Sequence, residues 1–172
     1  MIYHSLRRIL CISKSGFGFS LIELMVTVTI IGILLVVGVP SFVRFIGSQG
    51  VKTATYDLMA DLYFARSEAI KRNSTIDVQA TTCQAWQGGW TVRLGSTILR
   101  THDSMSGLNI TDSVNSSTNC KLSYNKAGRL ASSSMTFTID VSPSSSKVTP
   151  RCINIDLSGR ANSKLRSGST CS

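Results

Sequence analysis

The sequence predicts an α+β protein in which one long amino-terminal helix packs on an antiparallel β-sheet. Three observations predict this fold: an uncharged apolar run from Leu24 to Val43, an amphipathic helical pattern directly after it, and short Thr-, Val- and Ile-rich segments beyond Asn73. The chain has 172 residues, and the part beyond the apolar run is long enough for one domain with a modest core. No second domain is expected.

The apolar run has the length of a membrane-spanning helix. A helix of this length crosses about 30 Å of hydrocarbon at roughly 1.5 Å per residue. Arg7, Arg8 and Lys14 precede it, and a positive flank stays on the cytoplasmic side, so we expect the rest of the chain to be translocated. A secretory signal would carry its small residues after the run, whereas Gly18 precedes it, so cleavage at Gly18 would leave the helix on the mature protein.

An acidic residue, Glu23, lies among apolar neighbours at the start of this run. A carboxylate in hydrocarbon is costly unless it finds a partner, which makes Glu23 a candidate functional residue. The segment Gly18-Phe19-Ser20-Leu21-Ile22-Glu23 resembles the processing site of type IV prepilins and of type II secretion pseudopilins. A plain membrane anchor that carries a chance Glu is the alternative.

The resemblance implies how the chain is processed and assembled. Prepilin peptidase would cleave after Gly18, Phe19 would be N-methylated, and Glu23 would meet the amino terminus of a neighbouring pilin. Pro40 falls where many pilins carry a proline, and proline kinks or locally melts a helix. The chain then divides into a leader (1–18), a transmembrane and filament-core helix (19–43), an amphipathic continuation (44–73) and a β-rich periplasmic or extracellular head (74–172) with a basic carboxyl-terminal tail.

Apolar residues recur at helical spacing after the membrane run and should pack on the sheet; they are Val51, Ala54, Leu58, Leu62, Ala65 and Ala69. We expect the charged residues of this segment to be solvated on the other faces; they are Lys52, Asp57, Asp61, Arg66, Glu68, Lys71 and Arg72. Residues 61–73 also resemble the corresponding helix of FimT/GspH-like minor pilins and pseudopilins. Strands are predicted at 75–80, 90–94, 98–101, 108–111, 121–124, 135–141 and 152–157.

Four cysteines remain after leader removal, because Cys11 lies in the leader. An even number in an oxidising compartment favours two disulfides, although four cysteines allow three pairings. We favour Cys83 with Cys120 and Cys152 with Cys171. Free thiols or a metal site are the less favoured alternatives, because the sequence has no CxxC motif and His102 is the only histidine beyond the leader.

Two segments are predicted to form a strand and a turn that ends in Gly-Arg: one ends at Gly128-Arg129 and the other at Gly159-Arg160. Both are similar to positions of the FimT/GspH fold. Glycine suits a tight turn with close backbone approach, and the arginines would project from the turns. In FimT-like minor pilins a carboxyl-terminal Gly-Arg-x-Arg element is implicated in DNA uptake, but here Asn162 occupies the position of the second arginine.

Positive charge is concentrated at the end of the chain, where residues 121–172 carry eight Lys and Arg against two Asp. Such a surface attracts polyanions, and double-stranded DNA would be bound without sequence preference. The candidate DNA-binding residues are Arg160, Lys164 and Arg166, from a flexible tail held by Cys171, supported by Lys126, Arg129, Lys147 and Arg151. This predicts a type IV minor pilin that is inserted in the inner membrane and then incorporated into a surface pilus, where it captures DNA for natural transformation.

Two alternatives remain open: a GspH-type pseudopilin in a type II secretion pseudopilus, and a minor pilin whose basic tail serves only solubility or assembly. An enzyme is not expected, because the sequence has no phosphate-binding glycine loop and one histidine beyond the leader cannot plausibly complete a Ser-His-Asp site. No cofactor or metal is expected.

Overall fold

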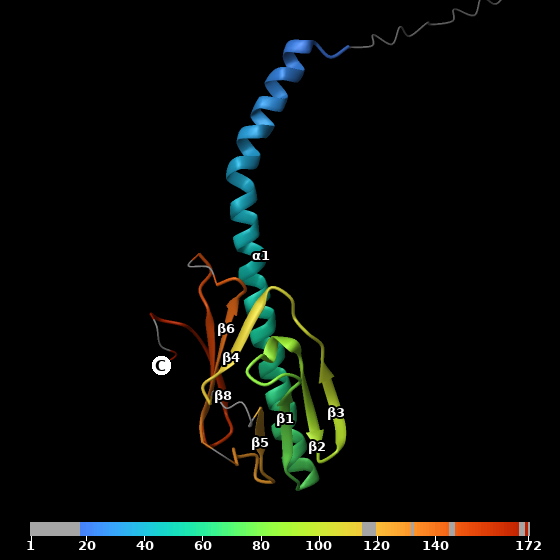
Figure 1. Cartoon of the computed structure of the whole chain (residues 1–172), viewed down its shortest axis with the longest axis vertical. Coiled ribbons are helices and arrows are strands. Elements are labelled where there is room, and N and C mark those ends of the chain that lie inside the picture. Colours follow the sequence, from blue (N-terminus) through green and yellow to red (C-terminus); the bar gives the residue numbers. More distant parts are fainter. Residues whose placement is uncertain (1–17, 115–119, 132, 145–146, 169–170, 172) are drawn as a thin grey trace, which may run out of the picture. The chain divides into compact units, whose positions relative to one another are not determined.

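The computed structural model describes residues 18–114, 120–131, 133–144, 147–168 and 171. Apart from Gly18, the expected leader lies outside the described residues. The chain divides into two compact units, Met1–Pro40 and Ser41–Ser172. The elements are α1 (Leu21–Arg72), β1 (Ile76–Ala80), the 3-10 helix η1 (Trp86–Gly88), β2 (Trp90–Leu94), β3 (Thr97–His102), β4 (Leu108–Asp112), β5 (Lys121–Tyr124), β6 (Met135–Val141), β7 (Arg151–Ile155) and β8 (Ala161–Leu165) (Figure 1).

The part of α1 in the first unit is apolar and exposed. It contains an 18-residue window of mean hydropathy 2.6, none of which is buried inside the protein. By length and composition α1 can cross a membrane, and among the described residues it is the one helix that can. Pro40 lies inside this helix.

The second unit contains two four-stranded antiparallel sheets. Their strand orders are β3-β2-β1-β5 and β4-β6-β7-β8. In Figure 1 both sheets lie beside the carboxyl-terminal half of α1. The predicted fold class, a long amino-terminal helix on antiparallel β-structure, is therefore confirmed, and each of the seven predicted strands is present with its ends shifted by two residues at most.

The eighth strand corrects the expectation of a flexible tail. Residues 161–165 pair with β7 in antiparallel register, from Ile155 opposite Ala161 to Arg151 opposite Leu165. The hydrogen bond from the Arg166 amide to the Pro150 carbonyl, at 2.9 Å, continues this pairing past the strand. The strand was missed because Ala161-Asn162-Ser163-Lys164-Leu165 contains no β-branched or aromatic residue, so its propensity is weak and the pairing with β7 decides its structure.

The apolar stripe of α1 is buried, as predicted. Val51, Ala54, Leu58, Leu62, Ala65 and Ala69 all belong to the core, together with the inward residues of both sheets. Trp86 and Trp90 are fully buried, and the Trp86 ring meets Phe137 edge to face at 4.8 Å. Trp86 lies in η1, and Trp90 is the first residue of β2.

Two acidic residues of α1 were wrongly expected to be solvated. Asp61 is only 3% exposed, and it accepts hydrogen bonds from Trp90 Nε1 and from Arg100 Nη1, each at 2.8 Å. The Arg100 guanidinium also lies over the Phe64 ring, 4.1 Å from its centroid. Because both carboxylate oxygens have donors, the charge can be buried, and it joins α1 to β2 and β3.

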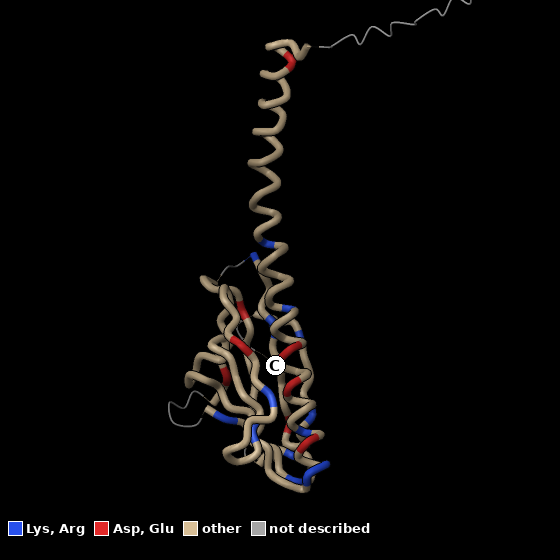
Figure 2. The backbone as a smooth tube through the Cα atoms, turned by 90° about the vertical axis from the view of Figure 1, so that its right-hand side faces the viewer, with Lys and Arg blue, Asp and Glu red and all other residues tan. Residues whose placement is uncertain are grey.

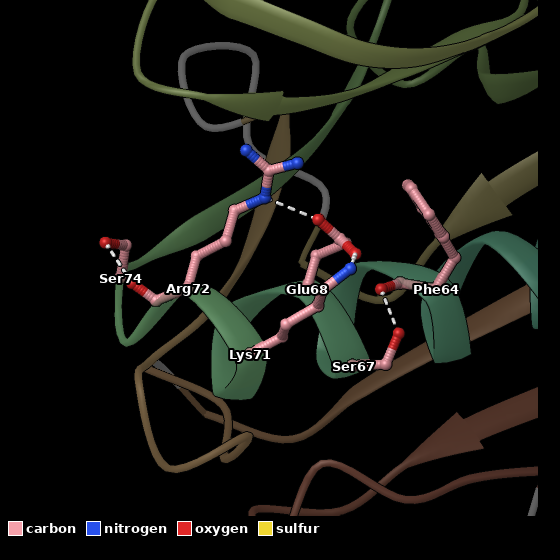
Figure 3. Close-up of polar contacts among 6 residues, drawn as sticks. All are labelled: Phe64, Ser67, Glu68, Lys71, Arg72 and Ser74. Atoms are coloured by element: carbon pink, nitrogen blue, oxygen red, sulfur yellow. Dashed lines mark hydrogen bonds and ion pairs between the residues drawn. The ribbon is translucent and has the colours of Figure 1, made fainter.

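Glu68 is the other buried acid, near the end of α1 (Figure 3). It accepts a hydrogen bond from Arg72 Nε, and Lys71 Nζ lies 3.7 Å from its second oxygen. These two cations hold the pKa of Glu68 below its usual range, the hydrogen bond from Arg72 contributing most. Asn73, with a φ of 49°, ends the helix where the sequence predicted.

The two Gly-Arg turns are stacked on each other and on α1. Gly128 and Gly159 have φ values of 69° and 79°. A Cβ at Gly159 would lie 2.2 Å from the Gly128 carbonyl oxygen, and a Cβ at Gly128 would lie 2.6 Å from Ile70 Cδ1. Arg66 Nε donates to the same Gly128 oxygen at 3.0 Å. Both glycines therefore suit their positive φ values and the small space around their Cα atoms. The contact between the two turns fixes the backbone positions of Arg129 and Arg160.

Changing Asp61 to Ala should destabilise the second unit by roughly 2–4 kcal/mol, because the buried Trp90 indole and the Arg100 guanidinium lose their acceptor. Urea unfolding followed by tryptophan fluorescence measures this. Asp57→Ala is the control, since Asp57 is 42% exposed and lies 3.6 Å from His102 Nε2; it should cost at most about 1 kcal/mol. Equal losses in the two variants would contradict a structural role for Asp61.

Changing Gly159 to Ala should destabilise the protein more than Gly95→Ala. Both glycines have positive φ, but a Cβ at Gly95 has nothing within 4 Å. The Gly95 change therefore carries only conformational strain, about 1 kcal/mol, and the Gly159 change adds a clash worth roughly 1–3 kcal/mol. Thermal melting of the two variants beside the unchanged chain gives the comparison, and similar melting temperatures would argue against the stacked turns.

Candidate functional site

A groove lies between α1 and the sheet edge formed by β8. Its volume is about 760 Å³, and its lining comprises Tyr63, Arg66, Asn154, Asp156, Arg160, Ala161, Asn162 and Lys164. Of the predicted DNA-binding residues, it contains Arg160 and Lys164, both exposed. We call it the Arg160 groove.

Hydrogen bonds from α1 fix the wall of the Arg160 groove. Tyr63 Oη donates to the Ala161 carbonyl at 2.7 Å, and Arg66 Nε donates to the Gly128 carbonyl. Tyr63 and Arg66 are three residues apart, so they lie on one side of the helix. The hydrogen bond from Nε holds the Arg66 guanidinium in place. The positively charged group therefore borders the groove in a defined orientation.

The Arg160 groove has three cations, Arg66, Arg160 and Lys164, and one carboxylate, Asp156. The Ser158 hydroxyl and the Arg160 backbone amide both donate to Asp156 Oδ1. These hydrogen bonds, the one from Ser158 first, hold the pKa of this carboxyl below its usual range. Asp156 thus stays ionised and closes the turn that carries Arg160, while the groove keeps an excess of positive charge.

Arg66 is a groove residue that the sequence analysis placed only on a solvated helix face. It is half-buried beside the turns at Gly128 and Gly159. Tyr124 is fully buried beside Gly159. Burial raises the pKa of the Tyr124 phenol far above its ordinary value, so this ring stays neutral. The resemblance of residues 61–73 to the family helix was the one signal that this helix segment has a special role.

Other predicted cations lie outside the Arg160 groove. Lys147 and Arg151 line a second groove of about 230 Å³, which also includes Lys52, Val51 and Leu165. We call it the Lys147 groove. Arg166 borders a different hollow, with Asp140 and Pro150. The tail cations predicted to act together are therefore divided: Arg160 and Lys164 line the Arg160 groove, and Arg166, which follows the last residue of β8, borders another hollow.

Lys126 and Arg129 belong to the turn that contacts the Arg160 turn. Both side chains are exposed. The turn is closed by the Asn125 amide donating to the Arg129 carbonyl at 2.9 Å and by Asn125 Oδ1 accepting from the Arg129 amide at 3.1 Å. The contact of Gly128 with Gly159 brings the backbone of this turn next to the Arg160 turn. Lys126 and Arg129 do not line the Arg160 groove.

Cys83 is bonded to Cys120 and Cys152 to Cys171, the pairing that the sequence favoured. Cys152 lies in β7 opposite Lys164. The Cys171 carbonyl accepts a hydrogen bond from Asn154 Nδ2 at 3.4 Å. The second disulfide thus attaches the end of the chain to β7, beside the strand that carries Lys164.

The predicted processing residues lie at the other end of the chain. Phe19 and Glu23 are exposed, and Glu23 is in the first turn of α1. No cluster of His, Cys, Asp or Glu suited to a metal ion occurs within the described ranges.

Figure 2 shows Lys and Arg along the second unit, with several at the end where α1 stops. Lys71 and Arg72 there are paired with Glu68, and Lys121 Nζ lies 3.0 Å from Asp77 Oδ2. Lys71, Arg72 and Lys121 line neither of the two grooves bordered by β8.

Comparisons with known proteins agree with this architecture. Residues 54–159 match the family described as Type II transport protein GspH, and residues 14–39 match the prokaryotic N-terminal methylation motif. A search of curated proteins found no match.

Three solved structures are similar. Two are crystal structures of the type IV minor pilin FimU of Pseudomonas aeruginosa (strain PAO1). One, in space group P21, has a TM-score of 0.59 and 26% identity over 73% of this chain and 95% of that chain. The other, in space group P65, has a TM-score of 0.56 and 27% identity over 69% and 94%. The minor pseudopilin EpsH from the type 2 secretion system of Vibrio cholerae shares the fold at 11% identity, with a TM-score of 0.51 over 70% and 98%.

The methylation motif covers the segment that the sequence analysis identified as a processing site, and the apolar helix behind it fits a protein anchored in the inner membrane. Since the GspH match spans more than half of the sequence, the chain belongs to the GspH family of type IV pilin-like proteins, which includes minor pilins and pseudopilins.

Proposed function

We propose that this chain is a minor type IV pilin that binds extracellular double-stranded DNA, without sequence preference, for uptake in natural transformation. The observation that carries the proposal is the Arg160 groove, where Arg66, Arg160 and Lys164 face one carboxylate that is already hydrogen-bonded. Guanidinium and ammonium groups are suited to phosphate oxygens, and such contacts position a nucleic acid without reading its sequence.

Asn162 departs from the family pattern, which has an arginine at this position. It lies in β8 opposite Asn154, and both line the Arg160 groove. An amide can donate to a phosphate oxygen but cannot neutralise it. Lys164, two residues further and therefore on the same face of β8, supplies the charge at the next position along the groove.

The minor pilin FimU, at 26–27% identity, supports a role in a type IV pilus. Force for DNA uptake would come from motor proteins elsewhere. The second candidate is a structural subunit of a type II secretion pseudopilus, which the GspH match and the fold of EpsH favour. Such a subunit would not need DNA-binding grooves.

The opposite end of the chain serves filament assembly in this proposal. Prepilin peptidase cleaves after Gly18, Phe19 is methylated, and Glu23 meets the amino terminus of a neighbouring pilin in the apolar filament core, where an unpaired charge would be costly. Pro40 lies within α1 and removes one helical hydrogen bond, so the helix can bend there.

The unchanged mature chain in non-ionic detergent should bind a 30-base-pair duplex of arbitrary sequence, with an affinity that falls steeply with salt. Replacing Arg160 and Lys164 with Ala should lower the salt-dependence slope by about 1.8, because each phosphate contact contributes roughly 0.9. Fluorescence anisotropy across salt concentrations measures this.

The control for this titration is Asn162→Ala, which changes the same strand without changing charge and should leave the slope unaltered. Absence of binding by the unchanged chain would overturn the DNA hypothesis. In cells lacking the gene, normal DNA uptake together with blocked protein secretion would select the pseudopilin function.

Replacing Gly18 with Leu should block processing, because a bulky side chain would occupy the cleavage position. Intact mass after expression with the peptidase would show the full precursor instead of a chain that begins at methylated Phe19. Ser20→Ala, two residues beyond the bond, is the control and should be processed. A mature Gly18→Leu protein would refute the cleavage site.

A further inference from the structure

A second group of cations lies along the same edge of the second unit. Lys52, Lys147 and Arg151 line the Lys147 groove, and no acidic side chain of the described residues lines it with them. Lys52 and Lys147 are exposed, and Arg151 is half-buried. The sequence predicted only a solvated helix face for Lys52, so its proximity to Lys147 and Arg151, about a hundred residues later, is a finding of the structure.

Both grooves are bordered by the same two elements. The Arg160 groove takes Tyr63 and Arg66 from α1 and Lys164 from β8, and the Lys147 groove takes Lys52 from α1 and Leu165 from β8. Lys164 and Leu165 are consecutive residues of β8, so the two grooves border adjacent positions of the same edge strand. Lys52 and Tyr63 are eleven residues apart, about three helical turns, and therefore lie on one side of α1.

The register of β7 and β8 explains how the two groups of cations come to lie on one edge. Arg151 is opposite Leu165, at the end of the pairing near Lys52. Ile155 is opposite Ala161, at the end near Tyr63, whose hydroxyl donates to the Ala161 carbonyl. The edge strand thus runs along α1 from one groove to the other.

The spacing between the groups suits a continuous polyanion. Lys52 and Arg66 are separated by 14 residues of α1, or about 21 Å along its axis. Successive base pairs of B-DNA advance by about 3.4 Å along the duplex axis, so six base pairs cover this distance, and after this half turn the phosphates of the opposite strand face the protein. A small anion would reach one groove, whereas a duplex longer than half a turn reaches both.

We propose that the edge formed by α1 and β8 is a two-ended binding surface for one DNA duplex, with the Arg160 groove and the Lys147 groove holding backbone phosphates about six base pairs apart. This inference rests on the proposed function and adds Lys52 and Arg66 to the binding residues. Two separated contacts on one edge also orient the duplex along β8. A single cationic patch would not fix this orientation.

The test compares two double variants of the full mature chain in non-ionic detergent. Lys52→Ala with Lys147→Ala removes two lysines of the Lys147 groove. Lys71→Ala with Lys121→Ala removes two lysines outside both grooves, so residue type and net charge are matched; these pair with Glu68 and Asp77. Melting temperatures establish that both variants are folded.

With a 30-base-pair duplex, the Lys52 and Lys147 variant should show a salt-dependence slope lower by about 1.8 and weaker binding at fixed salt, while the control keeps the slope of the unchanged chain within about 0.5. Arg66→Ala alone should lower the slope by about 0.9, and Arg66→Lys should restore it. Restoration by Lys separates a charge contact from the structural hydrogen bond that Arg66 Nε makes to Gly128.

The possible failures are distinguishable. If the unchanged chain binds DNA and the Lys52 and Lys147 variant has the slope of its control, the two-ended surface is refuted and the Arg160 groove acts alone. If both double variants lower the slope equally, net charge decides the affinity, and the proposed location of the binding surface is wrong. If the unchanged chain binds no DNA, the proposed function fails, and this inference fails with it.

Discussion

The second unit depends on burying one stripe of α1. Six small or aliphatic side chains of this stripe lie in the core, and the inward residues of both sheets pack around them. Since a helix offers one continuous apolar face, both sheets must meet it, and the edge of each sheet then lies beside an exposed flank of α1. The grooves along β8 lie where α1 and this sheet edge meet, and side chains of both elements line them.

Within this arrangement backbone contacts set the positions of Arg66 and of the two Gly-Arg turns. Gly159 lies against the Gly128 carbonyl, Gly128 lies against Ile70, and Arg66 donates to the same carbonyl. The chain of contacts connects α1 to both Gly-Arg turns. A phosphate site needs this kind of support, since a long flexible side chain loses rotamer entropy on binding unless the structure has already oriented it.

The sequence predicted most of the fold because the patterns there are strong. The helical stripe and seven strands follow from periodicity and β-branched composition, and the even number of cysteines indicated two disulfides, whose pairing is the one we favoured. The incorrect predictions have a common cause. In each case a tertiary contact overrides a local preference that is weak or points to a different structure. Asp61 is buried because Trp90 and Arg100 supply donors, and β8 forms because β7 offers it a partner.

The candidate site was predicted only in part for the same reason. Arg160 and Lys164 could be found from the charge of the carboxyl-terminal region and from the Gly-Arg turn. Lys52 and Arg66 could not, since their importance comes from elements about a hundred residues away in the sequence. Charge counted along the sequence also grouped Arg166 with Lys164, whereas the structure places them at different hollows.

An edge strand needs protection against pairing with other chains, and lysine on the edge is a common device. That requirement by itself explains Lys164 on β8. It does not explain Arg66 and Lys52, which belong to α1 and cannot block strand pairing, nor Arg160, which belongs to a turn. These four cations come from a strand, a helix and a turn and border the same edge, and Asp156 is the one carboxylate among the described residues that line either groove. Self-repulsion among like charges makes such a line unfavourable in the free protein. A bound polyanion would relieve that repulsion along the whole edge, which is why we assign the line of charge to binding and not to solubility.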